Sequence, residues 1–439
     1  MIRCDGLKRI LIVGEVFVDR HISPREIRLG GIFHVARTLH ALSSHYAAAW
    51  IAPAYLDDDC ERYFQQLDAP ISRKVGNVTG SPNLVEINDS AEAGEQRYVD
   101  LLRDKRRIQA DPDAMAALIA EFRPTDIIVV IDTWTRSVAE LLNVAEARVA
   151  LDIDHWPDDD TIPLDTPPAI VFSSTSGGPF QRHGRNPEVL REHWRSIGIP
   201  AAILKENRGG SRAWLKGEIS VEAPCFPTAT RHSVGVGECF DAAWVAASEQ
   251  EAPALRLRFA SWIASFYAAT FNHATFVDEV HTALTLDPSF ALLEGVRLPW
   301  ERRPDKNIYI AAPDFPTVDT RLLDELDAAL RYHNFTPRRP ILENGLADSS
   351  MSASLRRGLH AKDVALLEQC DLMIAVPISP DPGTFAELGW FSRSGKPTIL
   401  FDPHRLARNF FVEGSAARVC ETLGSVVDAV YEVLGRANL

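Results

Sequence analysis

The sequence predicts an α/β protein built from two doubly wound, parallel-rich domains. Short apolar runs alternate with amphipathic helical stretches along most of the chain, which is the pattern of strands and crossover helices in a parallel sheet. At 439 residues the chain is also too long for one ordinary core. A polar segment with two prolines, 296–306, separates two such alternating series. We therefore expect domains at 1–295 and 307–439, with 296–306 as a linker.

The composition is that of a globular protein without a strong bias toward one kind of partner. A net charge of -14 argues against a general affinity for nucleic acid or for an anionic membrane. The six cysteines form no C-x-x-C pair, which is typical of reduced thiols and not of a disulfide or zinc framework. No apolar run is long enough for a signal core or a membrane span. We expect a cytoplasmic protein with no metal site of its own.

The first domain opens as a strand followed by a helix. Residues 8–19, KRILIVGEVFVD, predict a buried strand that ends at Asp19, and the Gly30-Gly31 turn leads into an amphipathic helix that reaches residue 42. The polar stretch 80–108 predicts a lid or a surface excursion. Further strands of the doubly wound sheet are expected at 46–52, 126–131, 148–152, 169–172 and 201–204.

A glycine-rich segment precedes a helix near residue 235. In RHSVGVGECFDAAWVA, residues 231–246, Gly235 and Gly237 allow the backbone to approach a ligand closely. The free N–H groups at the start of the helix can hold a phosphate. Tight packing accounts for the same pattern equally well, so both interpretations stay open. Helices are expected to continue over residues 250–295.

Residues 8–295 resemble the ribokinase-like sugar and nucleoside kinases, also called the phosphofructokinase B family. The resemblance rests on GEVFVD, on the Gly-Gly turn and on HSVGVGECFDAA. It implies a ribokinase-like fold in which the glycine-rich segment forms an anion hole for the transferred phosphate, and it leaves ATP and Mg²⁺ open as ligands. The residues that it places in a kinase-like site are Asp19, Gly30, Gly31, Gly235, Gly237 and Glu238.

Several residues depart from that family's pattern. Glu238 stands at the position of the catalytic Asp, His232 replaces the leading Asp of the motif, and His34 replaces an Asn. The extra methylene of Glu displaces its carboxylate by about 1.5 Å, and a misplacement of about 1 Å can cost on the order of 100-fold in rate. The sequence therefore favours a retained fold that binds a nucleoside or nucleotide, or serves as a scaffold, over an active kinase.

The second domain repeats the alternation and places two carboxylates beyond a strand. The apolar run 372–376 predicts a buried strand, and the helix that follows it carries Glu387. Asp381 lies in the intervening turn. Ligands of open α/β sheets bind at this carboxyl edge of the strands. The other predicted elements are a strand at 307–312, a turn at 313–316, a helix at 320–333, a polar segment at 335–344, a helix at 359–369 and a strand after Gly395-Lys396-Pro397.

These residue types suit the cleavage of a bond between a base and a sugar, the reaction implied by the resemblance described next. Departure of the base leaves positive charge on the sugar, which Glu387 could stabilise or capture as a covalent ester. Asp381 could help the base to leave, and Gly383 would let the turn approach the sugar. Thr384 is expected to cap the helix. The plainer alternatives are an exposed helix glutamate and an aspartate that shapes the turn.

Residues 307–439 resemble the nucleoside 2-deoxyribosyltransferase family through IYIAAPDF, KDVALLEQCDLMIAV and DPGTFAELGWFSRSGKPTIL. The resemblance implies a smaller flavodoxin-like or Rossmann-like parallel α/β domain. It makes Glu387 the nucleophile and Asp381 a carboxylate that contacts sugar and base. The substrate-binding residues that it implies are Tyr309, Asp314, Gly383, Thr384 and Asn409.

The same resemblance implies a homo-oligomer, at least a dimer, because Asn409 in RNFFVEGS would reach a neighbouring subunit's site. The pair Arg338-Arg339 suits a phosphate slightly better than a solvated loop. The expected activity is cleavage of the N-glycosidic bond, or transfer of ribosyl or deoxyribosyl groups, on a nucleoside or nucleotide without a cofactor. The alternatives are a bifunctional kinase and glycosidase, and a non-catalytic nucleotide sensor.

Overall fold

The structure is a computed structural model, and its chain divides into two compact units. The first unit comprises Met1–Ala91 and Gln96–Gly295, and the second comprises Glu92–Glu95 and Val296–Leu439. The chain therefore enters the second unit twice. The residues that the structure describes are 8–95, 97–132, 135–142, 146–154, 164, 167–217, 219–285, 295–347 and 350–436.

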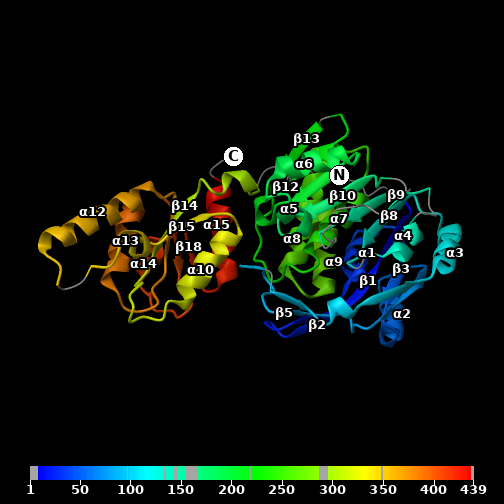
Figure 1. The fold of residues 1–439 in the computed structure, drawn as a ribbon, viewed down its shortest axis with the longest axis horizontal. Helices are drawn as coiled ribbons and strands as arrows, with labels where there is room; N and C mark the ends of the chain where they lie inside the picture. Colours follow the sequence, from blue (N-terminus) through cyan, green and yellow to red (C-terminus); the bar gives the residue numbers. More distant parts are fainter. Residues whose placement is uncertain are drawn as a thin grey trace. The chain divides into compact units, whose positions relative to one another are not determined.

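A large twisted sheet forms the centre of the first unit (Figure 1). Its strand order is β13-β12-β11-β10-β9-β8-β1-β3-β4-β7, and it is parallel from β11 to β4 with antiparallel strands at both edges. The predicted doubly wound sheet is thus confirmed. The strands are β1 (Ile10–His21), β3 (Tyr46–Ala52), β4 (Ser72–Thr79), β7 (Arg107–Ala110), β8 (Asp126–Val130), β9 (Arg148–Asp152), β10 (Ile170–Ser174), β11 (Ala202–Lys205), β12 (Ser211–Leu215) and β13 (Ile219–Ala223).

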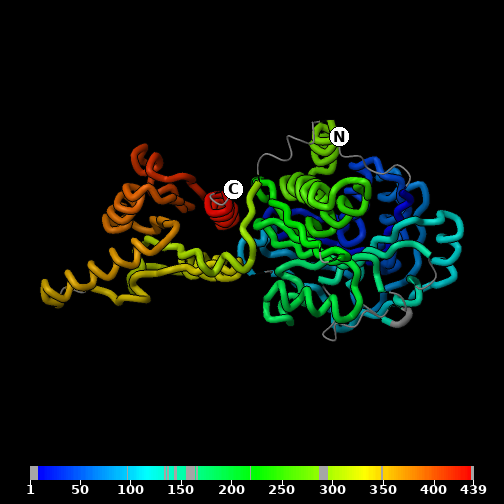
Figure 2. Tube along the Cα trace, turned by 90° about the horizontal axis from the view of Figure 1, so that it is seen from above, coloured from blue at the N-terminus to red at the C-terminus, as the bar shows by residue number. Residues whose placement is uncertain are grey.

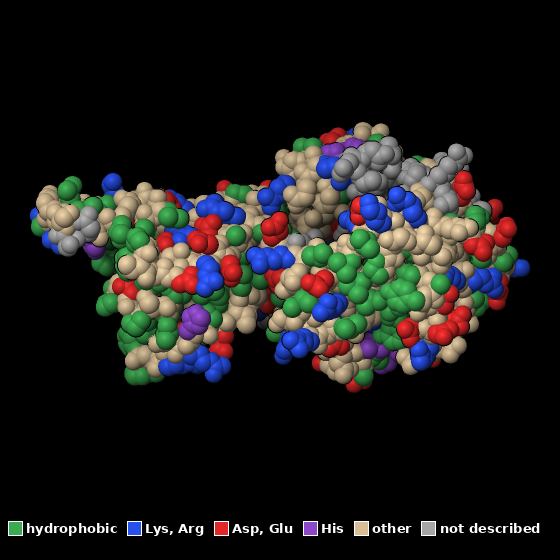
Figure 3. Space-filling model, turned by 60° about the horizontal axis from the view of Figure 1, so that its bottom comes forward, with side chains coloured by type: hydrophobic (Ala, Val, Ile, Leu, Met, Phe, Trp, Pro, Cys, Tyr) green, Lys and Arg blue, Asp and Glu red, His purple; other side chains and the backbone are tan. Residues whose placement is uncertain are grey.

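A smaller sheet, called the lid sheet here, extends from the second half of β1. It contains β2 (Glu26–Gly31), β5 (Leu84–Ile87) and β6 (Tyr98–Asp100). The excursion at 80–108 therefore supplies paired strands, and the expected Gly30-Gly31 turn is the end of a strand. Large apolar side chains are exposed on these strands, among them Ile27 and Val99, and Figure 3 shows hydrophobic side chains gathered on this face of the first unit.

Helices cover both faces of the large sheet, and the main core lies under α1, α7 and α8. Of the helical region expected at 250–295, residues 286–294 lie outside the described residues. The helices are α1 (Ile32–Ala41), α2 (Asp57–Gln66), α3 (Pro112–Phe122), α4 (Arg136–Leu142), α5 (Gly178–Arg182), α6 (Pro187–Ser196), α7 (Val236–Ala246), α8 (Pro253–Ala269) and α9 (His273–Thr285), with 3-10 turns at Ala54–Leu56, Arg103–Lys105 and Asn207–Gly209.

The second unit is a parallel sheet with helices on both faces, which confirms the smaller parallel α/β domain. Its strand order is β15-β14-β16-β17-β18. The strands are β14 (Asn307–Ala311), β15 (Thr336–Arg338), β16 (Leu372–Ala375), β17 (Thr398–Phe401) and β18 (Arg418–Cys420). The helices are α10 (Arg321–Tyr332), α11 (Pro340–Asn344), α12 (Ala353–Gln369), α13 (Pro382–Arg393), α14 (Phe410–Gly414) and α15 (Leu423–Arg436), with a 3-10 turn at Trp300–Arg302.

Three segments of the second unit differ from their predicted form. The expected linker 296–306 packs in this unit because its alternating apolar residues Val296, Leu298 and Trp300 are buried. The polar segment 335–344 contains the edge strand β15 and the helix α11. Helix α12 begins earlier than predicted, and Figure 2 shows its first half extending away from the rest of the unit. No helix in the described ranges is long and apolar enough to cross a membrane.

Candidate active site

Tyr309, in the middle of β14, meets Glu387 of α13, the helix that follows the carboxyl end of β16. Tyr309 lies on β14 with its side chain fully buried, and its hydroxyl donates a hydrogen bond of 2.9 Å to Oε1 of Glu387. Glu387 lies in the second turn of α13, which follows the neighbouring parallel strand β16. Two residues that are distant in sequence are thus brought together where ligands of α/β sheets bind.

The pattern of α13 places Glu387 at the border between core and surface. Thr384, Leu388 and Phe391 are buried on one side of it. Gly383, Ala386 and Trp390 lie on its other side and are exposed. Glu387 is therefore half-buried, and its open side is lined by two small residues and one aromatic residue.

The environment of Glu387 opposes its ionisation. Burial, followed by the negative charges of Asp363 and Asp381, raises the pKa of Glu387 to about 7, although the hydrogen bond from Tyr309 acts in the opposite direction. Burial and the charge of Glu387 also raise the pKa of Tyr309 above its ordinary value. Tyr309 therefore stays protonated and serves as the donor. A carboxyl group tuned in this way is typical of catalytic sites.

Asp363 is a third carboxylate of this site, and the sequence did not single it out. It lies half-buried on α12, and its Oδ1 accepts a hydrogen bond of 2.9 Å from Nδ2 of Asn344. The helical spacing of the sequence could have identified Asp363. Asp363 precedes the buried Leu366 and Leu367 by three and four residues, which places it on the inward face of α12.

The expectation that Thr384 caps α13 is wrong, because Asp381 is the capping residue. The Asp381 carboxylate accepts hydrogen bonds from the backbone N–H groups of Gly383 (3.2 Å) and Thr384 (2.9 Å), and from the Thr384 hydroxyl (2.8 Å). Thr384 is already inside the helix and is buried. A Cβ atom at Gly383 would lie 3.1 Å from Oδ2 of Asp381, so glycine keeps this turn compact.

In the first unit, Asp19 is enclosed by its neighbours. Nε2 of His34 lies 3.0 Å from Oδ2 of Asp19, and both side chains are buried. Nδ1 of His34 faces the Tyr267 hydroxyl at 2.7 Å. A Cβ atom at Gly30 would lie 2.1 Å from the Asp19 carboxylate, so the β2 backbone covers it. Burial lowers the pKa of His34 to about 4 despite the nearby Asp19, and the histidine is neutral at pH 7.

The glycine-rich segment precedes α7 as the sequence indicated. Gly235 has a φ of 80°, and a Cβ atom there would collide with the His34 ring. Glu238 lies in the first turn of α7. Lys205 lies beside Gly237, and its Nζ forms ion pairs with Asp152 and Asp241 at 2.9 and 3.0 Å.

These contacts do not fit a Mg²⁺–ATP complex. Two carboxylates near the glycine-rich segment, the half-buried Asp152 and the buried Asp241, are already bound by the Lys205 ammonium group. Across the described ranges, no group of three or more His, Cys, Asp or Glu side chains is arranged to hold a metal ion. We therefore derive no phosphoryl-transfer step for the first unit.

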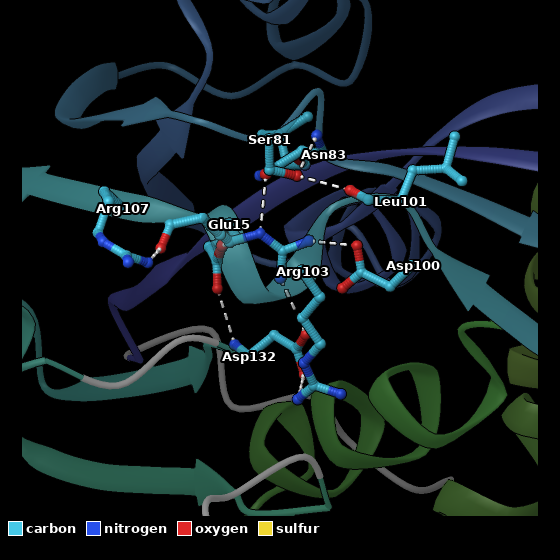
Figure 4. Close-up of polar contacts among 10 residues, drawn as sticks. Glu15, Ser81, Asn83, Asp100, Leu101, Arg103, Arg107 and Asp132 are labelled. Atoms are coloured by element: carbon cyan, nitrogen blue, oxygen red, sulfur yellow. Dashed lines mark hydrogen bonds and ion pairs between the residues drawn. The ribbon is translucent and has the colours of Figure 1, made fainter.

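A buried polar network around Arg106 ties the lid sheet to the large sheet, and sequence reasoning missed it (Figure 4). Arg106 donates from Nε to Asn83 at 3.0 Å, and its other nitrogens reach Asp100 at 2.5 Å and Asp132 at 3.2 Å. The Asp132 backbone N–H donates to Glu15 on β1 at 2.9 Å. The network therefore fixes the position of β6 relative to β1 and β8.

Part of the second unit matches a family model. Residues 308–426 match the family model of nucleoside 2-deoxyribosyltransferase. The match contains Tyr309, Asp363, Asp381 and Glu387, and it confirms the resemblance stated for this part of the chain. The second unit is hereafter called the deoxyribosyltransferase-like unit. A search of curated proteins gave no match.

Solved structures similar to this chain include three kinases. Ribokinase from Thermotoga maritima is 14% identical with a TM-score of 0.44, over 64% of this chain and 100% of that chain. Phosphofructokinase-2 from Escherichia coli is 13% identical with a TM-score of 0.46, over 64% and 100%. Ribokinase from Arabidopsis thaliana is 14% identical with a TM-score of 0.43, over 64% and 99%.

In the deoxyribosyltransferase-like unit, the two candidate phosphate-binding arginines are engaged by acidic side chains. Arg339 binds Asp314 through two hydrogen bonds of 2.9 and 2.8 Å and Asp324 through one of 2.6 Å. Arg338 binds Glu343 through bonds of 2.8 and 2.5 Å. The sequence interpretation that favoured a phosphate here is not supported, and the Asp314 carboxylate is held by Arg339.

Asn409 lies at the start of α14. It caps α14, and its Oδ1 accepts a hydrogen bond of 2.9 Å from the Phe411 backbone N–H. In the described part of the unit, Asn409 has no hydrogen bond to Tyr309 or Glu387. Its neighbours Phe410 and Phe411 are 85% and 72% exposed.

Proposed function

We propose that the deoxyribosyltransferase-like unit breaks the N-glycosidic bond of a nucleoside or nucleotide, with Glu387 as the nucleophile. The observation that carries this proposal is the hydrogen bond from Tyr309 to Glu387. The match of residues 308–426 to the nucleoside 2-deoxyribosyltransferase family supports it. Water or a second base would then accept the sugar, which gives hydrolysis or transfer.

The proposed reaction has two steps. Oε2 of Glu387 attacks C1′ of the sugar while the C1′–N bond breaks and its electron pair moves to the base. Tyr309 holds the other oxygen of the carboxylate and so orients it. The departing base takes up a proton from solvent. Water, which loses a proton to solvent, or an incoming base then displaces the Glu387 carboxylate from C1′. The negative charges of Asp363 and Asp381 stabilise the positive charge that develops on the sugar in both steps.

We propose further that the active form is at least a dimer and that Asn409 acts in a neighbouring subunit's site. The exposed Phe410 and Phe411 beside it suit a surface that another copy covers. For the first unit, we propose nucleoside binding or scaffolding without phosphoryl transfer. The enclosure of Asp19 by His34 and the β2 backbone favours scaffolding over binding through this carboxylate.

The test is incubation of the purified chain with nucleosides and nucleotides, with and without ATP, followed by chromatography for free base and phosphorylated product. We expect release of base without ATP and no phosphorylated product. Glu387→Ala should lower the release by at least about 1,000-fold. The matched control is Glu325→Gln, which removes an exposed carboxylate on α10. Undiminished release by folded Glu387→Ala protein contradicts the proposed function.

A further inference from the structure

The charges that surround Glu387 have one sign. Asp363 and Asp381 are the two charged groups that act on the Glu387 carboxyl. In the described part of the chain, Asp363, Asp381 and Glu387 form no ion pair with an arginine, lysine or histidine. The arginines expected to bind phosphate are paired with other acids. The site therefore has a negative potential that opposes an anionic substrate and attracts a cationic one.

The polar groups beside Glu387 are already engaged in hydrogen bonds. Asp381 accepts three hydrogen bonds from the start of α13. Asp363 accepts a hydrogen bond from Asn344, and Tyr309 gives its proton to the bond with Glu387. A neutral base must gain a proton as it leaves. In the hydrogen bonds described, the two aspartates accept and Tyr309 donates to Glu387, so none of the three donates toward a leaving base.

The open side of Glu387 also suits a flat cation. Gly383 and Ala386 leave room beside the carboxylate, and Trp390 lies one helical turn after it with 53% of its surface exposed. Side chains of a helix lean toward its N-terminus, so the indole leans toward Glu387. An indole face attracts a cationic ring more strongly than a neutral ring.

We infer that the preferred substrate is a nucleoside whose base carries a positive charge, either an N-glycosyl pyridinium or an N7-alkylated purine nucleoside without a 5′-phosphate. This inference rests on the proposed function. The C1′–N bond breaks, its electron pair neutralises the base nitrogen, and Glu387 forms an ester with C1′. Water then attacks C1′, the carboxylate leaves, and the water proton goes to solvent. The base leaves neutral, and no acid has to protonate it.

The experiment compares pairs of substrates that differ in charge and share their shape. The probes are 7-methylguanosine against guanosine, and nicotinamide riboside against its reduced, uncharged form, as ribosides and 2′-deoxyribosides. Each kcat/KM is divided by the uncatalysed rate, because the cationic members are intrinsically more labile. We expect the cationic member of each pair to be favoured by about 100-fold. A 5′-phosphate on the cationic member should lower kcat/KM by at least about 10-fold.

Variants test whether the named residues cause the preference. Asp363→Asn keeps the acceptor for Asn344 and removes the charge, so the preference should fall by about 10-fold. Trp390→Leu should also reduce it, and Glu325→Gln should leave it unchanged. Equal or better cleavage of the neutral members through Glu387 overturns this inference and leaves the proposed function standing. Absence of Glu387-dependent cleavage for every probe overturns both.

Discussion

The ionisation of Glu387 links its environment to its proposed chemistry. Its pKa of about 7 means that the nucleophilic carboxylate forms only as the pH rises through neutrality. We expect kcat to increase up to about pH 7 and to level off above it. Tyr309→Phe removes the hydrogen bond that lowers this pKa, so it should move the rise to higher pH and reduce the plateau by about 10-fold. A pH–rate profile with an unchanged midpoint contradicts this role for Tyr309.

The same pKa predicts a pH-dependent cost to folding. In the unfolded chain Glu387 ionises near 4.5, whereas in the folded chain it ionises near 7. Protonated Glu387 therefore makes its full contribution to the free energy of unfolding below about pH 4.5. This contribution is lost as the pH rises through 7. Glu387→Gln should be more stable than the parent protein by about 1–3 kcal/mol at pH 8 and equal to it at pH 4.

Urea unfolding at the two pH values measures this difference. Glu325→Gln is the control, because it makes the same substitution at an exposed position on α10. A Glu387→Gln protein that is less stable than the parent at pH 8 would show that the ionised carboxylate stabilises the fold, contrary to the prediction.

At the scale of the element, α13 depends on Asp381 for its first turn. Asp381→Ala removes the acceptor for two backbone N–H groups and should destabilise the second unit by about 1–2 kcal/mol. Asp381→Ser keeps a capping oxygen and should restore most of this stability. Both variants lose the negative charge near Glu387, so base release should fall in both. Full activity in the Asp381→Ser variant would mean that Asp381 caps α13 and has no role in base release.

The sequence predicted the elements of this site better than their contacts. Periodicity placed Glu387 on a helix just past the carboxyl end of a strand, whereas Tyr309 came only from the resemblance to the nucleoside 2-deoxyribosyltransferase family. Asp363 depends on how α12 packs across the sheet, which local pattern does not determine. The sequence pattern favoured phosphate binding by Arg339, because it could not show that Asp314 and Asp324 would be its partners. These two residues come from a loop and a separate helix. Sequence shows a charge, but only packing identifies the group that neutralises it.

At the scale of the whole molecule, each unit has its own hydrophobic core. Leu39 belongs to the core of the first unit, and Ile374 belongs to a core of the second. We expect two transitions in thermal unfolding. Leu39→Ala should lower one transition and Ile374→Ala the other, each by about 2–5 kcal/mol. Calorimetry measures both. A single transition that both variants shift equally would mean that the units unfold together.

The short segment Glu92–Glu95 gives the second unit an unusual dependence on distant sequence. Ala93 is buried in its core, and Glu92 accepts a hydrogen bond of 2.5 Å from the Tyr332 hydroxyl. A gene fragment that begins at the codon for Val296 omits both residues, and its product has a gap under α10. Recombination at residue 295 would therefore move the second unit without part of its core.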